Sequence, residues 1–238
     1  MPHSPLQVFI GYDPVEPVAY HVLAHSIIRQ SSIPVSITPV ALQHFSFFYK
    51  RAWDKKQSNE FAFSRFLVPH LCGFGAAPAI WMDADMLVRC DIAELSALHD
   101  RRRAVQVVQS IDFRPDDGTK YLGRPQSAYP ELEDGTTRKL WSAMMMFTPR
   151  WCWNLTPKYV QSMPGLALHQ FDWCEKNRLG ELDGVWQHVV GHDPYDAGAK
   201  IVHWTLGGPW FGEKYAGVDY ADEWREEYAR MTFAETEK

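Results

Sequence analysis

The chain has 238 residues, of which 46% are apolar, and its formal net charge is -5. This length and this apolar content are typical of one sizeable folded domain and exclude a disordered chain. The negative charge disfavours a broad nucleic-acid surface. The only dense basic run, three arginines at 101–103, is expected to lie in a solvated loop.

The cysteine pattern and the lack of long apolar runs indicate in which cellular compartment the protein is expected. The four cysteines lie far apart and form no Cys-x-x-Cys pair, which argues against a zinc cluster and against a disulfide framework. No signal peptide is visible, and no apolar run approaches the ~20 residues of a membrane span. We therefore expect a cytoplasmic protein with no integral membrane segment.

The N-terminal part alternates strand and helix signals. Apolar residues at 6–10, ended by Gly11, predict a strand, and Pro17 with periodic apolar residues predicts a helix to about Arg29. The β-branched run at 35–40 predicts a second strand, so the opening is β-α-β and favours a parallel sheet. The first strand is followed by Gly-Tyr-Asp-Pro, which does not match the Gly-rich phosphate-binding motif G-x-G-x-x-G. This disfavours a dinucleotide-binding Rossmann domain.

Further elements follow from apolar periodicity and turn residues. We predict helices at 59–72, 91–99, 166–177 and 221–231, and strands beginning at Ala79 and covering 104–108, 140–147 and 201–203. The segment 112–137 is rich in Gly, Pro, Asp and Tyr, and a stretch of this length is typical of a lid or binding loop.

Asp83 and Asp85 stand where the apolar run from Ala79 breaks, separated by one residue. Ligands collect at the carboxyl ends of strands in an open α/β sheet, and carboxylates there suit Mg²⁺ or Mn²⁺ with open positions for phosphate. We hypothesise a divalent cation that holds the diphosphate of a nucleotide donor. The alternative is a surface turn that leads into the next helix.

Two other residues could complete such a site. His203 ends an apolar strand and is followed by Gly207 and Gly208, so it is a candidate third metal ligand. Arg65 lies off the apolar face of the predicted helix 59–72, and its forked donors suit phosphate. The alternatives are a structural histidine and a surface arginine in an ion pair.

Four motifs occur in a familiar order: Phe-Ser-Arg-Phe-Leu-Val-Pro at 63–69, Trp-Met-Asp-Ala-Asp-Met-Leu at 81–87, Ser-Ala-Met-Met-Met-Phe at 142–147 and His-Trp-Thr-Leu-Gly-Gly-Pro-Trp at 203–210. With these motifs the chain resembles the GT-A fold nucleotide-sugar glycosyltransferases, closest to glycosyltransferase family 8 and its bacterial and phage-type relatives. The resemblance covers about residues 6–212.

The resemblance implies an α/β fold with a mostly parallel, Rossmann-like central sheet flanked by helices in a single domain, 1–238. Residues 1–110 would form the nucleotide-binding half and 111–212 the sugar and acceptor half, and 213–238 a C-terminal helix. It also implies a UDP-sugar donor, Mn²⁺ or Mg²⁺, and transfer with retention of anomeric configuration.

Site residues are assigned by matching this chain to the family motifs. The resemblance implies metal ligands at Asp83, Asp85 and His203, catalytic roles for both aspartates, Arg65 and Gln170, and donor contacts from Gly11, Tyr12, Asp13, Arg65, Asp83, Ala84, Gly207 and Gly208. Gln170 would lie near the anomeric carbon, and Gly11 to Asp13 near the base and ribose.

The chain departs from the family at two places. The closing motif of the family usually carries a lysine before Pro-Trp, but this chain has Gly208 there. The usual Asp-Gln-Asp is replaced by Leu-His-Gln-Phe-Asp at 168–172, so the first acid is absent and the group that supports the reacting face of the sugar is open.

Two other functions compete with glycosyl transfer. A sugar-phosphate nucleotidyltransferase should carry an N-terminal Gly-rich basic loop, which is absent here. A non-catalytic module that binds nucleotide sugars would keep the motifs as scaffolding. The acceptor is open: a saccharide or other glycan, a lipopolysaccharide core and a protein all fit, and modified nucleic acid is disfavoured by net charge.

Overall fold

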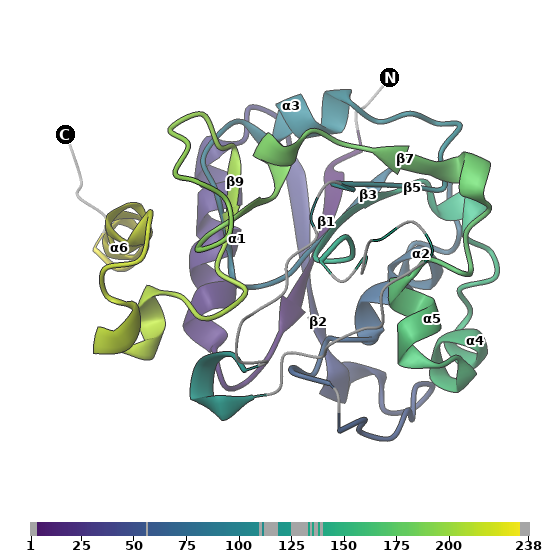
Figure 1. Cartoon of the computed structure of the whole chain (residues 1–238). Helices are drawn as coiled ribbons and strands as arrows, with labels where there is room; N and C mark the ends of the chain where they lie inside the picture. The colour runs from purple at the N-terminus through teal and green to yellow at the C-terminus, as the bar shows by residue number, and fades with distance from the viewer. Residues whose placement is uncertain are drawn as a thin grey trace.

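The computed structural model describes residues 4–55, 57–109, 111, 119–124, 133, 135, 138 and 140–233. Helices lie around a twisted central sheet, with the C-terminal helix on the outside of the first one (Figure 1). Most of the predicted lid segment, 112–137, lies outside the described residues. In the part of the chain that is described, no helix is long and apolar enough to cross a bilayer.

The central sheet has six strands in the order β2-β1-β3-β6-β5-β7. β1 pairs in parallel with β2 and β3, and β5 pairs in parallel with β7, whereas β6 runs antiparallel to both of its neighbours. The strands are β1 (Leu6–Tyr12), β2 (Val35–Ala41), β3 (Ala79–Met82), β5 (Val105–Val107), β6 (Met144–Phe147) and β7 (Leu179–Glu181). The mostly parallel α/β sheet that the sequence predicts is confirmed.

Burial explains the composition of the central strands. Every residue of β3 and of β6 is buried, which agrees with their continuous apolar runs. Helix α1 (Pro17–Gln30) crosses between β1 and β2 and turns Val22, Leu23 and Ile27 inward. The predicted β-α-β opening is therefore present with nearly the predicted limits.

A second sheet of three strands begins where β3 ends. It has the order β4-β9-β8, formed by β4 (Met86–Val88), β9 (Ile201–His203) and β8 (His188–Val189). Between β3 and β4 the chain leaves one sheet and enters the other within the residues Asp83, Ala84 and Asp85. The paired acids therefore lie in the short connection where the chain passes from the central sheet to the second sheet.

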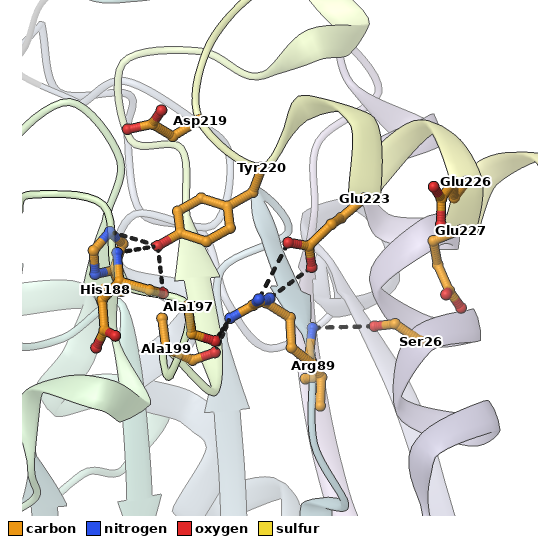
Figure 2. Close-up of polar contacts among 12 residues, drawn as sticks. Ser26, Arg89, His188, Ala197, Ala199, Asp219, Tyr220, Glu223, Glu226 and Glu227 are labelled. Atoms are coloured by element: carbon orange, nitrogen blue, oxygen red, sulfur yellow. Dashed lines mark hydrogen bonds and ion pairs between the residues drawn. The ribbon is translucent and has the colours of Figure 1, made fainter.

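The remaining α-helices are α2 (Val68–Leu71), α3 (Ile92–Ala97), α4 (Pro157–Ser162), α5 (Gly165–His169) and α6 (Ala221–Thr232). Figure 2 shows how α6 is attached to the second sheet: Arg89, next to β4, forms a two-pronged ion pair with Glu223 at 2.6 and 3.1 Å. The hydroxyl of Tyr220 donates to Asp196 O at 2.8 Å and contacts His188 Nε2 at 3.2 Å. The C-terminal helix is thus part of the same folded unit.

Three predicted elements are wrong in extent. The helix expected at 59–72 begins at Ser64 as a 3₁₀ turn and continues as α2, and the strand expected at 140–147 begins at Met144. The helix expected at 166–177 ends at His169, because Phe171 has a φ of +63° and cannot continue it. Strands β4, β7 and β8 and helix α4 are not in the prediction at all.

Candidate metal and donor site

Strand register brings the predicted metal ligands together. β4 and β9 are antiparallel, with Met86 opposite His203, and the amide of Trp204 donates to Asp85 O at 2.9 Å. Asp83 follows β3 directly, and its backbone amide donates a hydrogen bond to Ala143 O at 2.9 Å. Residues that are 118 positions apart in the sequence, Asp85 and His203, therefore face one another at the end of two strands.

The three side chains form a compact buried cluster. One ligand atom from each of Asp83, Asp85 and His203 lies within 4.8 Å of the other two. His203 Nε2 is 3.3 Å from Asp85 Oδ1, both atoms are buried, and neither has a hydrogen-bond partner among the described residues. Burying a polar atom without a hydrogen-bond partner costs folding free energy. The lone pairs of these two atoms therefore indicate that a bound group, such as a cation, interacts with both.

The donor set fits a divalent cation of the Mn²⁺ or Mg²⁺ type. Two carboxylates supply hard oxygen ligands, and one imidazole adds a nitrogen ligand that Mn²⁺ accepts more readily than Mg²⁺. Three protein ligands on one side leave positions for ligand oxygens. The arrangement of Asp83, Asp85 and His203 therefore fits the group that the resemblance implies.

Arg65 pairs with the first of these acids. Its Nη1 lies 2.9 Å from Asp83 Oδ1 and also donates to Ser142 O at 2.8 Å, and Trp81 Nε1 donates to the same carboxylate at 2.9 Å. The guanidinium carbon lies 5.6 and 5.4 Å from the ring centroids of Phe61 and Trp81. The pair is buried, so Arg65 is not the surface arginine of the alternative interpretation.

The two acids differ in protonation behaviour. Burial raises the pKa of Asp83, and the charge of Arg65 opposes that rise. Burial also acts to raise the pKa of Asp85, but the neighbouring His203 and the ammonium of Lys120 outweigh it, and the pKa of Asp85 falls below its usual value. Asp85 is therefore the more readily ionised ligand.

The residues predicted to bind the nucleotide are closely packed. A side chain at Gly11 would meet the ring of Phe61 at 2.5 Å, so this glycine is required by that packing. The carboxylate of Asp13 accepts from the amides of Val15 and Glu60 and forms an ion pair with Arg124 at 2.9 Å. Tyr12 packs edge-on against Tyr20, with ring centroids 5.6 Å apart. Their contact with a nucleotide stays a prediction.

The glycine loop after β9 is shaped by aromatic side chains. Gly207 has a φ of +129°, and a Cβ there would lie 2.8 Å from the ring of Tyr215. A Cβ at Gly208 would lie 2.1 Å from the ring of Trp210. Ala84, between the two acids, is fully buried, so its side chain belongs to the core. Donor contacts by these three residues stay predictions.

Gln170 follows the end of α5. Its amide donates to Leu166 O at 2.8 Å, and its carbonyl accepts from Arg138 Nη1 at 3.3 Å. The preceding His169 is buried and its Nδ1 lies 2.8 Å from Ser142 Oγ. Because Ser142 O also bonds Arg65, α5 is connected to the acid cluster through two side chains. The role of Gln170 at the anomeric carbon stays a prediction.

Glu16, Lys120 and Tyr121 are site residues that sequence reasoning missed. All three are buried, and Glu16 accepts from the Tyr121 hydroxyl at 2.6 Å and from Trp210 Nε1 at 3.2 Å. Burial, followed by the nearby charge of Asp85, raises the pKa of Glu16 to about 8. The only signal in the sequence was that Glu16 precedes a helix that begins with a proline, where an acid is common.

No protein-family model matches this chain. Protein CDI of Arabidopsis thaliana is 39% identical over 234 residues, which cover 94% of this chain and 86% of the relative. At this identity and coverage the two proteins are homologous over almost their whole length.

Several solved structures share the fold. The WbbM bifunctional glycosyltransferase has a TM-score of 0.66 at 17% identity over 95% of this chain, which spans only 50% of the WbbM chain. The galactosyltransferase LgtC, solved with donor and acceptor sugar analogues, has a TM-score of 0.57 at 11% identity, covering 95% of this chain and 96% of LgtC. Mouse xyloside xylosyltransferase 1 has a TM-score of 0.53 at 13% identity over 85% of this chain and 98% of its own. The chain thus has the GT-A fold of these glycosyltransferases and belongs to the family of the Arabidopsis protein CDI.

Proposed function

We propose that the chain is a glycosyltransferase that moves a sugar from a nucleotide-sugar donor to an acceptor, with Mn²⁺ or Mg²⁺ held by Asp83, Asp85 and His203. The observation that supports this most strongly is the buried cluster of these side chains with lone pairs that have no partner. It stands at a strand end in a GT-A fold, where ligands collect in open α/β sheets.

The residues of the site would each perform one task. When bound, the cation would act as a Lewis acid on the departing diphosphate. Arg65 favours the ionised form of Asp83 and orients this carboxylate, since it holds it at 2.9 Å and is itself anchored on Ser142. Preorganised charges of this kind stabilise the negative charge that develops on the leaving oxygen.

The finer assignments rest on the resemblance and belong to the same proposal. The donor is a UDP-sugar, with its base and ribose near Gly11 to Asp13 and its diphosphate near Gly207 and Gly208. Transfer proceeds with retention, with Gln170 near the anomeric carbon. The acceptor is a saccharide or another glycan, residues 1–110 form the nucleotide half, and a cytoplasmic location stays a prediction from the sequence.

A donor screen tests the proposal. The purified chain is incubated with UDP-, GDP- and TDP-sugars with Mn²⁺, and thermal stabilisation and donor hydrolysis are measured. We expect one nucleotide class to raise the melting temperature and to be hydrolysed slowly, with EDTA abolishing hydrolysis and Mn²⁺ restoring it. Stabilisation without any hydrolysis or transfer would favour a binding module, and no effect from any donor would contradict the proposal.

A further inference from the structure

Lys120 is a largely buried lysine whose ammonium forms no ion pair with any described residue. Only 8% of the residue is exposed, and among the described residues its Nζ makes no ion pair and no hydrogen bond. Its Nζ lies 5.1 Å from the centroid of the Tyr121 ring. Lysines that are largely buried are normally paired, so this position is expected to meet an anion when the site is filled.

The neighbouring Tyr121 fixes Lys120 beside the loop after β9. The Tyr121 amide donates to Leu206 O at 2.9 Å, its hydroxyl donates to Glu16, and its ring stacks on Phe211 at 4.3 Å. The loop that includes Leu206 follows directly on His203. Three independent contacts of its neighbour therefore place Lys120 beside the glycine loop, and its charge is close enough to Asp85 to lower the pKa of that carboxylate.

The charge balance of the site leaves Lys120 available to a ligand. Its ammonium acts on Asp85 and on Glu16, lowering the pKa of each against the effect of burial. A divalent cation, together with Arg65, would outweigh the negative charges of Asp83 and Asp85. The charge of Lys120 then has no counterpart in the described part of the site, and an anionic ligand next to the cation would supply one.

The glycine loop cannot supply this charge. Residues 204–212 contain no lysine or arginine. A side chain at Gly208 would collide with the ring of Trp210, since even a Cβ would lie 2.1 Å from it. The lysine that the resemblance leads us to expect at position 208 would therefore require the ring of Trp210 to move.

We propose that Lys120 binds a phosphate oxygen of the donor diphosphate and so takes the place of a lysine at position 208. This inference rests on the proposed function, because it requires a nucleoside diphosphate next to the cation. The hydrogen bonds from Tyr121 and Trp210 to Glu16 hold the segment 119–124 against the glycine loop. They thereby position the Lys120 ammonium beside the expected site of the diphosphate.

The test compares two probes on the same variants by titration calorimetry. The first probe is UDP, GDP or TDP with saturating Mn²⁺, whichever binds the unmodified chain most tightly, and the second is Mn²⁺ alone. Lys120→Met and Lys120→Gln remove the charge, and Lys120→Arg keeps it. Lys214→Met is the matched control, since Lys214 is exposed and lies on the ring of Tyr215 in the same region.

We expect both neutral variants to bind the diphosphate about ten- to hundredfold more weakly, as for the loss of a charged hydrogen bond. Lys120→Arg should retain more affinity than either neutral variant, and Lys214→Met should be unchanged. Mn²⁺ alone should bind the neutral variants at least as tightly as before, because a repelling charge has been removed. A purely structural role of Lys120 would instead weaken both probes together.

The experiment distinguishes failure of the Lys120 proposal from failure of the proposed function. If the unmodified chain binds a nucleoside diphosphate and both neutral variants bind it equally well, the role of Lys120 is wrong and the proposed function stands. If the unmodified chain binds none of the three diphosphates with Mn²⁺, the proposed function and the role of Lys120 are both wrong. Parallel weakening of both probes also overturns the role of Lys120.

Discussion

His203 Nε2 lies 3.3 Å from Asp85 Oδ1, and neither atom has a hydrogen-bond partner among the described residues. A structural His–Asp pair in a core normally satisfies at least one of these atoms by a well-aligned bond. Here the contact is close but misaligned, and Asp83 faces the same point. This geometry favours a shared cation over a structural pair, and the predictions below follow from it.

Asp85→Asn should abolish transfer while the chain stays folded. The amide keeps the shape of the side chain but removes the negative charge that holds the cation, so we expect activity to fall by about 10²–10³-fold or more. Asp219→Asn is the matched control, because Asp219 is an exposed acid outside the cluster. Turnover of Asp85→Asn near that of the unmodified chain would refute the metal role.

Arg65→Met should destabilise the chain. Arg65 and Asp83 are both buried, and removing one partner of such a pair leaves the other charge uncompensated, at a cost of about 3–5 kcal/mol of unfolding free energy. The measurement is urea unfolding in EDTA. Arg225→Met, which breaks the exposed pair with Asp222, should change the unfolding free energy by less than about 1 kcal/mol.

Addition of Mn²⁺ to Arg65→Met tests whether Asp83 binds the cation. If the cation binds Asp83, Mn²⁺ should restore part of the lost stability of Arg65→Met, since it supplies the missing positive charge. Equal melting temperatures with Mn²⁺ and with EDTA would mean that Asp83 is not a ligand in this variant.

Glu16 should make stability depend on pH. Burial and Asp85 raise the pKa of Glu16 to about 8 from 4.5, so the folded state holds a proton that the unfolded state releases. The unfolding free energy is therefore expected to fall as pH rises from about 4.5 to about 8. Glu16→Gln cannot titrate, so its stability relative to the unmodified chain should rise across this window.

The measurement for Glu16 is a series of unfolding curves between pH 4.5 and 8 in EDTA, which removes effects of bound cation. The difference between Glu16→Gln and the unmodified chain cancels the contribution of histidines, because both proteins carry the same ones. A difference that stays constant with pH would show that Glu16 titrates near its ordinary pKa.

Gly208→Ala should loosen the loop after β9. The added methyl group would lie 2.1 Å from the ring of Trp210, so the ring or the loop must move, at a cost of about 1–3 kcal/mol. Tryptophan fluorescence and urea unfolding report the two effects. Gly217→Ala is the control, since a Cβ there meets nothing within 4 Å, and equal stability of both variants would contradict the packing argument.

Much of the fold could be predicted because local signals agree with the tertiary structure. The strands β1, β2 and β9 and the helices α1 and α6 follow from apolar periodicity and from proline or glycine at their ends. The acid pair and His203 could be proposed because each stands where an apolar strand ends. Strand register then accounts for their meeting.

The remainder depends on contacts that no local pattern shows. The helix from Gly165 ends early because Phe171 adopts a left-handed conformation in which its ring packs near Trp141 and Trp173. Glu16 meets Tyr121 across 105 positions, and nothing near either residue indicates the partner. That Glu16 and Lys120 lie near the acid pair therefore follows only from the folded structure, in which the glycine loop lies beside the segment 119–124.

The most direct test of the account is a crystal structure of the chain with Mn²⁺ and UDP, with the ion located by anomalous scattering. The account predicts one Mn²⁺ bound by a side-chain atom of each of Asp83, Asp85 and His203, in contact with the diphosphate. A diphosphate bound without an ion at these three residues, or an ion bound elsewhere, would contradict it.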